Sequence, residues 1–203
     1  MNWEKWYLKE DPWRIKEGNK FTLKWIDELK KLINKIKLNG LHLDGGCGEG
    51  YVTSLIFKDL DVRFIGIDIS RKALKRVKGL ESIKMLFKET FYNSHLKIKL
   101  SILFCFWRSI YYVKDWRFCL DEAKRILKKN GYILLSVALG KNYLRYWEVN
   151  KEFRMRFSLL DKMIVGTSIF GTLAKILLSH PQYAKLLLLG QKIERVRGRY
   201  GDE

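Results

Sequence analysis

The chain has 203 residues, of which 47% are hydrophobic, and its 40 basic and 22 acidic side chains give a formal net charge of +18. This length suits one domain with a sizeable core, and the hydrophobic fraction excludes a disordered chain. The charge favours an anionic partner such as nucleic acid, anionic lipid or an anionic substrate. Three cysteines without a CxxC pair and three scattered histidines indicate no disulfide framework and no metal site. We expect a cytoplasmic protein without a transmembrane segment.

Strands and helices alternate through the middle of the sequence. Apolar residues at helical spacing first predict a helix over 22–37, which Asn39-Gly40 ends. Short apolar strands then follow, with helices between them. The strands are expected at 41–44, 62–68, 83–89, 100–106 and 132–139, and the helices at 51–60, 70–79 and 115–131. This alternation predicts a mostly parallel sheet with helices on both faces.

The C-terminal third has a less regular pattern. Residues 143–179 are expected to be helical, and 183–189 and 192–198 to form an antiparallel hairpin around Gly190-Gln191. A continuous helix over 182–197 is the alternative to this hairpin. No Pro/Ser-rich linker divides the chain, so we expect one domain over 1–203. It would comprise an N-terminal helical lid segment (1–40), a ligand-binding core (41–139) and a C-terminal helical insertion with the last strands (140–203).

The first predicted strand of the sheet runs into a glycine cluster, LHLDGGCGEG at 41–50. Such a cluster allows a tight turn or a ligand lying close to the backbone, and ligands bind at the carboxyl ends of parallel strands. The phosphate loop GxxxxGK[ST] is absent, and the last glycine of GxGxxG is replaced by Tyr51. Residues 41–70 carry two basic and five acidic side chains in a basic protein, which suits a ligand with positive charge.

The segment from Asp44 to Gly50 resembles motif I of the class I S-adenosylmethionine-dependent methyltransferases, an acidic residue followed by xGxGxG. Asp68 matches the acid that ends the family's second strand, and Glu89 matches the acid near the adenine amine. The resemblance implies a Rossmann-like, doubly wound, mostly parallel seven-stranded sheet with an antiparallel C-terminal hairpin. It implies that the chain is an enzyme with S-adenosylmethionine as cofactor. The cofactor-binding residues would be Asp44, Gly45, Gly46, Cys47, Gly48, Gly50, Asp68, Ile69, Glu89 and Phe106.

The acceptor is indicated by two shorter segments. Asp11-Pro12-Trp13 and Ile110-Tyr111-Tyr112-Val113 are similar to segments of the nodulation-type N-methyltransferases. This similarity implies a small or medium-sized acceptor with a nitrogen or oxygen nucleophile, but no residue stands out as the general base. The [ND]PP[YF] motif of base-amine methyltransferases is absent after the predicted fourth strand. An RNA methyltransferase and a non-catalytic binding protein remain alternatives. The candidate substrate-binding residues are Trp13, Trp107, Tyr111 and Tyr112.

Four of the seven tryptophans lie in the first 25 residues. Trp3, Trp6 and Tyr7 share one face of a helix, so they either pack into the core or belong to a lid over the ligand. Pro12 favours an extended conformation at Asp11, which would turn that helix toward the pocket.

Overall fold

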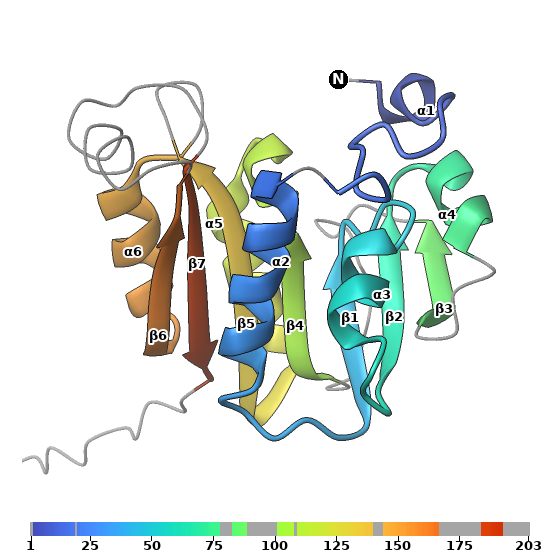
Figure 1. The fold of residues 1–203 in the computed structure, drawn as a ribbon. Coiled ribbons are helices and arrows are strands. Elements are labelled where there is room, and N and C mark those ends of the chain that lie inside the picture. Colours follow the sequence, from blue (N-terminus) through green and yellow to red (C-terminus); the bar gives the residue numbers. More distant parts are fainter. Residues whose placement is uncertain are drawn as a thin grey trace, which may run out of the picture.

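The structure is a computed structural model that describes residues 2–18, 20–77, 83–88, 101–107, 109–139, 144–166 and 184–192. These ranges form an α/β fold around one sheet with the strand order β3-β2-β1-β4-β5-β7-β6 (Figure 1). The strands are β1 Leu41–Gly45, β2 Arg63–Asp68, β3 Ile83–Lys88, β4 Ser101–Trp107, β5 Leu127–Leu139, β6 Ser158–Val165 and β7 Ala184–Gln191.

The sheet is mixed and mostly parallel, as the sequence predicts. Strands β1 to β5 pair in parallel, whereas β7 is antiparallel to both of its neighbours, β5 and β6. The predicted partner of 184–191 is wrong, because this strand pairs with β5 on one side and with 158–165 on the other. Residues 193–198 of the predicted hairpin lie outside the described residues. The helix expected over 143–179 is also wrong at 158–165, which forms β6. Since both faces of β6 carry apolar side chains, with Ile164 packed on one core cluster and Met163 on the other, this segment can flank the buried residues 185–190 of β7.

Two further segments differ from the predicted secondary structure. The helix expected to reach Gly131 ends at Ile126, and β5 begins at once with Leu127, which is fully buried and pairs with Ser101 of β4. Asn130 adopts a φ of 59° in this segment, a conformation that asparagine tolerates better than most residues. The continuous helix over 182–197 is also wrong, because Ala184–Gln191 is a strand.

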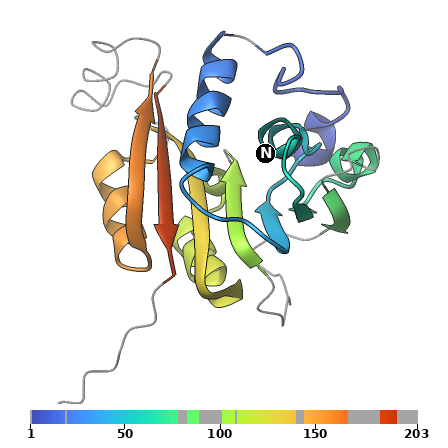
Figure 2. The same cartoon turned by 60° about the horizontal axis from the view of Figure 1, so that its bottom comes forward.

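Helices cover both faces of the sheet (Figures 1 and 2). One layer contains α2 Lys20–Ile33, α3 Tyr51–Phe57 and α4 Arg71–Val77, and the other contains α5 Trp116–Ile126 and α6 Tyr146–Arg154. The short helix α1 Trp3–Trp6 and the 3-10 helix η2 Ile110–Tyr112 lie outside these layers. Within the described ranges, no helix combines the length and hydrophobicity that a membrane crossing requires.

Side-chain hydrogen bonds fix two helices of the first layer. Trp25 of α2 is fully buried, and its indole Nε1 donates a hydrogen bond to Ser136 Oγ on β5 at 2.9 Å. Trp25 therefore belongs to the core and not to a lid. Ser70 caps α4 as predicted, since its Oγ accepts a hydrogen bond from Ala73 N at 3.2 Å.

His42 of β1 is a fully buried histidine whose ring lies 5.2 Å from that of Phe64. Neither ring nitrogen has a hydrogen-bond partner among the described residues. Burial lowers the pKa of this imidazole to about 4. Below the unfolded-state pKa of about 6.5, the unfolded chain therefore takes up a proton that the folded protein does not bind.

This difference predicts an acid-sensitive fold. Between pH 6.5 and pH 4, His42 should lower the free energy of unfolding by about 1.4 kcal/mol per pH unit. We expect wild type to lose about 2 kcal/mol more than His42→Leu between pH 7 and pH 5, measured by denaturant unfolding. Other groups titrate in both proteins, so the difference isolates His42. Equal pH dependence in the two proteins would contradict the prediction.

Candidate active site

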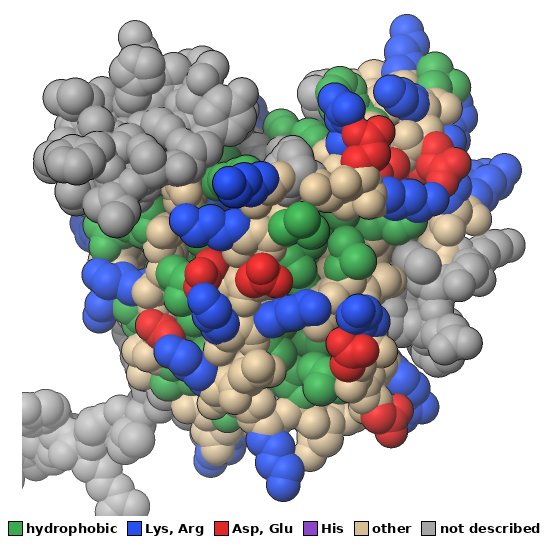
Figure 3. Space-filling view, viewed as in Figure 1, with side chains coloured by type: hydrophobic (Ala, Val, Ile, Leu, Met, Phe, Trp, Pro, Cys, Tyr) green, Lys and Arg blue, Asp and Glu red, His purple; other side chains and the backbone are tan. Residues whose placement is uncertain are grey.

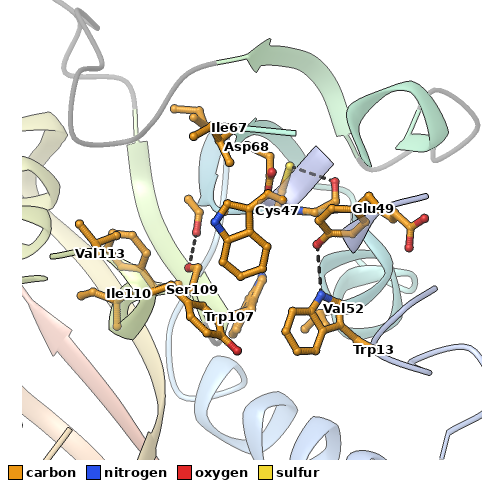
Figure 4. A pocket seen from close by; sticks show the side chains of 18 of the residues that line it. Trp13, Cys47, Glu49, Val52, Ile67, Asp68, Trp107, Ser109, Ile110 and Val113 are labelled. Atoms are coloured by element: carbon orange, nitrogen blue, oxygen red, sulfur yellow. Dashed lines mark hydrogen bonds between the residues drawn. The ribbon is translucent and has the colours of Figure 1, made fainter. Parts of the chain in front are cut away.

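A cavity of about 780 Å³ opens at the carboxyl ends of β1, β2 and β4. Its lining residues come from the glycine loop after β1, the ends of β2 and β4, η2 and the N-terminal residues 3–15. Figure 4 shows Asp68 and Cys47 on one side of this cavity, with Trp107 and Ser109 facing them and Trp13 nearby. The volume falls in the range of ~300–1,000 Å³ that is typical of small-molecule sites.

The glycine loop is fixed against β2 by its own backbone. Gly46 N and Cys47 N both donate to the carbonyl oxygen of Ile67, at 2.7 and 3.0 Å. Gly46 and Gly48 have φ angles of 77° and 54°, which other residues rarely adopt. A Cβ at Gly46 would lie 2.4 Å from Ser109 Cβ, and one at Gly48 would lie 2.5 Å from Tyr7 Oη. Only glycine fits at these two positions.

Asp68 ties the glycine loop to the end of β2. Its Oδ2 accepts a hydrogen bond from Gly48 N, and its Oδ1 accepts one from Ser70 N, both at 2.8 Å. Burial raises the pKa of this carboxyl, whereas the hydrogen bonds from backbone amides lower it. A carboxylate oxygen can accept two hydrogen bonds, so both oxygens keep the capacity to accept from a ligand diol.

Asp44 lies beneath the loop and does not line the cavity. It is fully buried, its Oδ2 accepts a hydrogen bond from the Thr53 hydroxyl, and its Oδ1 has no partner among the described residues. Thr53 Oγ1 also accepts from Trp107 Nε1 at 2.7 Å, which connects Asp44 to the cavity wall. Burial raises the pKa of Asp44 to about 7. A cofactor contact by Asp44 itself stays a prediction.

Most of the predicted site residues meet at this cavity. Those that line it are Gly45, Gly46, Cys47, Gly48, Asp68, Ile69, Phe106, Trp13, Trp107 and Tyr112. Gly50, with a φ of 76°, does not line the cavity but directly precedes α3. Glu89 and the side chain of Tyr111 lie outside the part of the chain that the structure describes. Sequence reasoning missed Glu49 and Ser109, although both lie within or directly beside the segments that it used.

Residues 2–18 form an N-terminal strap across the cavity. Trp3, Tyr7 and Trp13 of the strap line it, and Trp13 Nε1 donates a hydrogen bond to Tyr7 Oη at 3.1 Å. The ring of Trp3 meets that of Tyr112 edge-on at 4.8 Å, so the strap contacts η2. This position agrees with a lid, although the opening and closing of the strap stays a prediction.

Ionic contacts hold the strap on the glycine loop and on α4. Arg76 donates to Glu49 Oε1 at 2.6 Å, and also to the carbonyl oxygens of Leu8 and Lys9 at 3.3 and 3.1 Å. Glu49 is 4% exposed, and its Oε2 accepts from Asp11 N at 2.9 Å. The pair of Glu49 and Arg76 therefore joins three segments.

The turn after the strap helix does not have the expected conformation. Asp11 has a φ of 44° and is not extended. Its carboxylate accepts hydrogen bonds from the backbone amides of Ile15 and Lys16, at 2.8 and 2.7 Å. These bonds and the contact with Glu49 outweigh the preference that Pro12 imposes on the preceding residue.

The sequence matches a family model described as "Methyltransferase domain" over residues 20–161. The chain belongs to this methyltransferase family. Because the match covers residues 20–161, it confirms the predicted methyltransferase family. No curated protein matches the chain significantly in sequence.

Solved structures agree on the fold. The N-methyltransferase NodS from Bradyrhizobium japonicum WM9, in complex with S-adenosyl-L-homocysteine, has a TM-score of 0.76 at 17% identity, covering 94% of this chain and 96% of NodS. A chain of the complex between the Haloferax volcanii Trm112 methyltransferase activator and a methyltransferase gives 0.72 at 14% identity, covering 95% and 98%. The [4+2]-cyclase SpnF gives 0.65 at 15% identity, covering 82% and 80%. Such identities establish the fold alone, since one fold hosts several chemistries.

Proposed function

We propose that this chain catalyses methyl transfer from S-adenosylmethionine to a small or medium-sized acceptor with a nitrogen or oxygen nucleophile. The observation that carries the proposal is the cavity, in which the glycine loop and Asp68 face an aromatic wall at the end of β4. The methyltransferase family and the bound S-adenosylhomocysteine of the similar NodS structure support the cofactor.

The residues present fit this cofactor. Gly46 and Gly48 line the cavity, so a ligand can lie against the backbone of the loop there. Asp68 retains hydrogen-bonding capacity for the ribose hydroxyls, and Ile69 and Phe106 add apolar surface to the same cavity. When bound, the cofactor supplies a methyl group that its sulfonium has already activated.

The protein then has to orient the two reactants and exclude water. Trp13, Trp107 and Tyr112 line the part of the cavity between the strap and the end of β4, where we place the acceptor. No histidine occurs among the described lining residues, and burial raises the pKa of the Tyr7 hydroxyl, which keeps it protonated. A nucleophile that reacts without a strong base, such as a neutral amine, is therefore favoured over a hydroxyl.

Ligand binding provides the first test. We expect S-adenosylhomocysteine at 100 times its dissociation constant to raise the free energy of unfolding by ~2.7 kcal/mol. Thermal unfolding, followed with and without ligand, reports this as a higher midpoint. An unchanged midpoint at millimolar ligand would refute the cofactor assignment. A substrate screen with radiolabelled S-adenosylmethionine, comparing extracted metabolites with RNA, then identifies the acceptor and excludes a non-catalytic binding protein if label is transferred.

RNA methylation is a second candidate, which one surface feature supports. Five exposed basic side chains lie on the strap and α4 beside the cavity: Lys5, Lys9, Arg71, Lys72 and Lys75. They form no ion pair within the described residues. Figure 3 shows basic side chains gathered over this part of the surface, with acidic ones among them. Filter binding to structured RNA across salt concentrations tests this candidate, because contacts to phosphate alone are lost at high salt.

A further inference from the structure

The acceptor half of the cavity contains one basic side chain. Lys114 follows η2 and is exposed at the end of a lining segment that also contributes Tyr112 and Val113. It is the one lysine, arginine or histidine among the described residues that line the cavity. No hydrogen bond or ion pair of its ammonium occurs within the described ranges. Tyr112 and Val113 before it are aromatic and apolar, and Asp115 after it is acidic, so Lys114 supplies the positive charge on this wall.

The acidic residues of the cavity are already bound to other groups. Asp11, Glu49 and Asp68 each accept hydrogen bonds at both carboxylate oxygens from groups of the protein. Asp115, next to Lys114, caps α5 and accepts from the backbone amide of Phe118 at 3.4 Å. A positively charged acceptor would therefore meet carboxylates that already accept hydrogen bonds from the protein, of which Asp68 is assigned to the cofactor. An anionic acceptor would meet the ammonium group of Lys114, which has no partner within the described ranges.

We infer that the acceptor carries an anionic group, a phosphate or a carboxylate, which Lys114 binds. This inference rests on the proposed function. The ring or apolar part of the acceptor would lie on Tyr112 and Trp13, with the anion at the rim. The net charge of +18 acts in the same direction, because it raises the local concentration of anions and repels cations. Lys114 would thus determine acceptor specificity without touching the transferred methyl group.

The inference is tested with matched pairs of a neutral compound and its phosphate ester: glucose and glucose 6-phosphate, glucosamine and glucosamine 6-phosphate, uridine and uridine monophosphate. Each is titrated at low salt into the intact protein saturated with S-adenosylhomocysteine, and quenching of tryptophan fluorescence is followed. Trp3, Trp13 and Trp107 line the cavity and report binding there. The variant is Lys114→Gln. The matched control is Lys128→Gln, an exposed lysine at the start of β5, at the opposite end of that strand from the cavity.

In at least one pair, the phosphate ester should bind wild type at least tenfold more tightly than its neutral partner. Lys114→Gln should abolish this preference, and Lys128→Gln should retain it. The inference is overturned if no pair shows the preference, if no probe binds, or if Lys114→Gln retains it. It is also overturned if Lys114→Gln weakens the binding of S-adenosylhomocysteine by the same factor as the binding of the phosphate ester, because the lysine would then bind the cofactor carboxylate. Failure of S-adenosylhomocysteine to bind wild type would instead refute the proposed function.

Discussion

Replacing Asp68 with alanine is expected to weaken the binding of S-adenosylhomocysteine by about 1.5–3 kcal/mol, the scale of losing a hydrogen bond to a charged group. The substitution would remove the bonds to the ligand diol, the bond from Gly48 N that ties the glycine loop to β2, and the bond from Ser70 N at the start of α4. We therefore expect weaker binding together with a lower thermal midpoint. Isothermal titration and thermal unfolding measure the two effects separately.

Asp61→Ala is the matched control, since this aspartate is exposed in the loop before β2 and lines no part of the cavity. It should bind S-adenosylhomocysteine like wild type. Asp68→Asn keeps one oxygen that can accept a hydrogen bond, and it should fall between wild type and Asp68→Ala. If Asp68→Ala binds the ligand with wild-type affinity, Asp68 is not the ribose ligand, and its role is confined to holding the loop.

The glycine loop and Asp68 of the candidate site were predictable because their signals are local in sequence. Glycines at positions 46 and 48 are required by their φ angles and by the close approach of Ser109 and Tyr7. Asp68 ends a strand that pairs directly with β1, so two short motifs sufficed to place the loop and the acid together. Parallel pairing of apolar strands follows from the same alternation of strands and helices.

The ion pair that holds the strap and the pairing of the last two strands depend on contacts between residues that lie far apart in sequence. Arg76 belongs to a basic run that looks like the solvated face of a helix, and its partner Glu49 lies 27 residues away. No local pattern distinguishes it from the exposed Lys75 beside it. The pairing of β6 with β7 has the same origin, because an apolar segment can serve in a helix or a strand until its neighbour is known.

The contacts of Arg76 allow the strap to be tested without replacing a residue that lines the cavity. Arg76 does not line the cavity, yet it binds Glu49 and two carbonyl oxygens of the strap. Arg76→Gln leaves the nearly buried Glu49 carboxylate without its ionic partner. Breaking a fully buried pair lowers the free energy of unfolding by about 3–5 kcal/mol, and the loss is smaller here because Arg76 is partly exposed. We expect S-adenosylhomocysteine to dissociate roughly tenfold faster, equivalent to about 1.4 kcal/mol.

Stopped-flow tryptophan fluorescence measures this dissociation, and hydrogen exchange measures the opening of residues 2–18. Lys75→Gln on the same helix is the matched control, and it should leave both rates unchanged.

Deleting residues 2–9 is the stronger variant, because it removes Trp3 and Tyr7 from the cavity but keeps the buried Ile15 in the core. This shortened chain should fold and lose methyl transfer, since water would enter the site. If it folds and transfers methyl groups at the wild-type rate, the strap is not a lid, and the cavity must be closed by other residues.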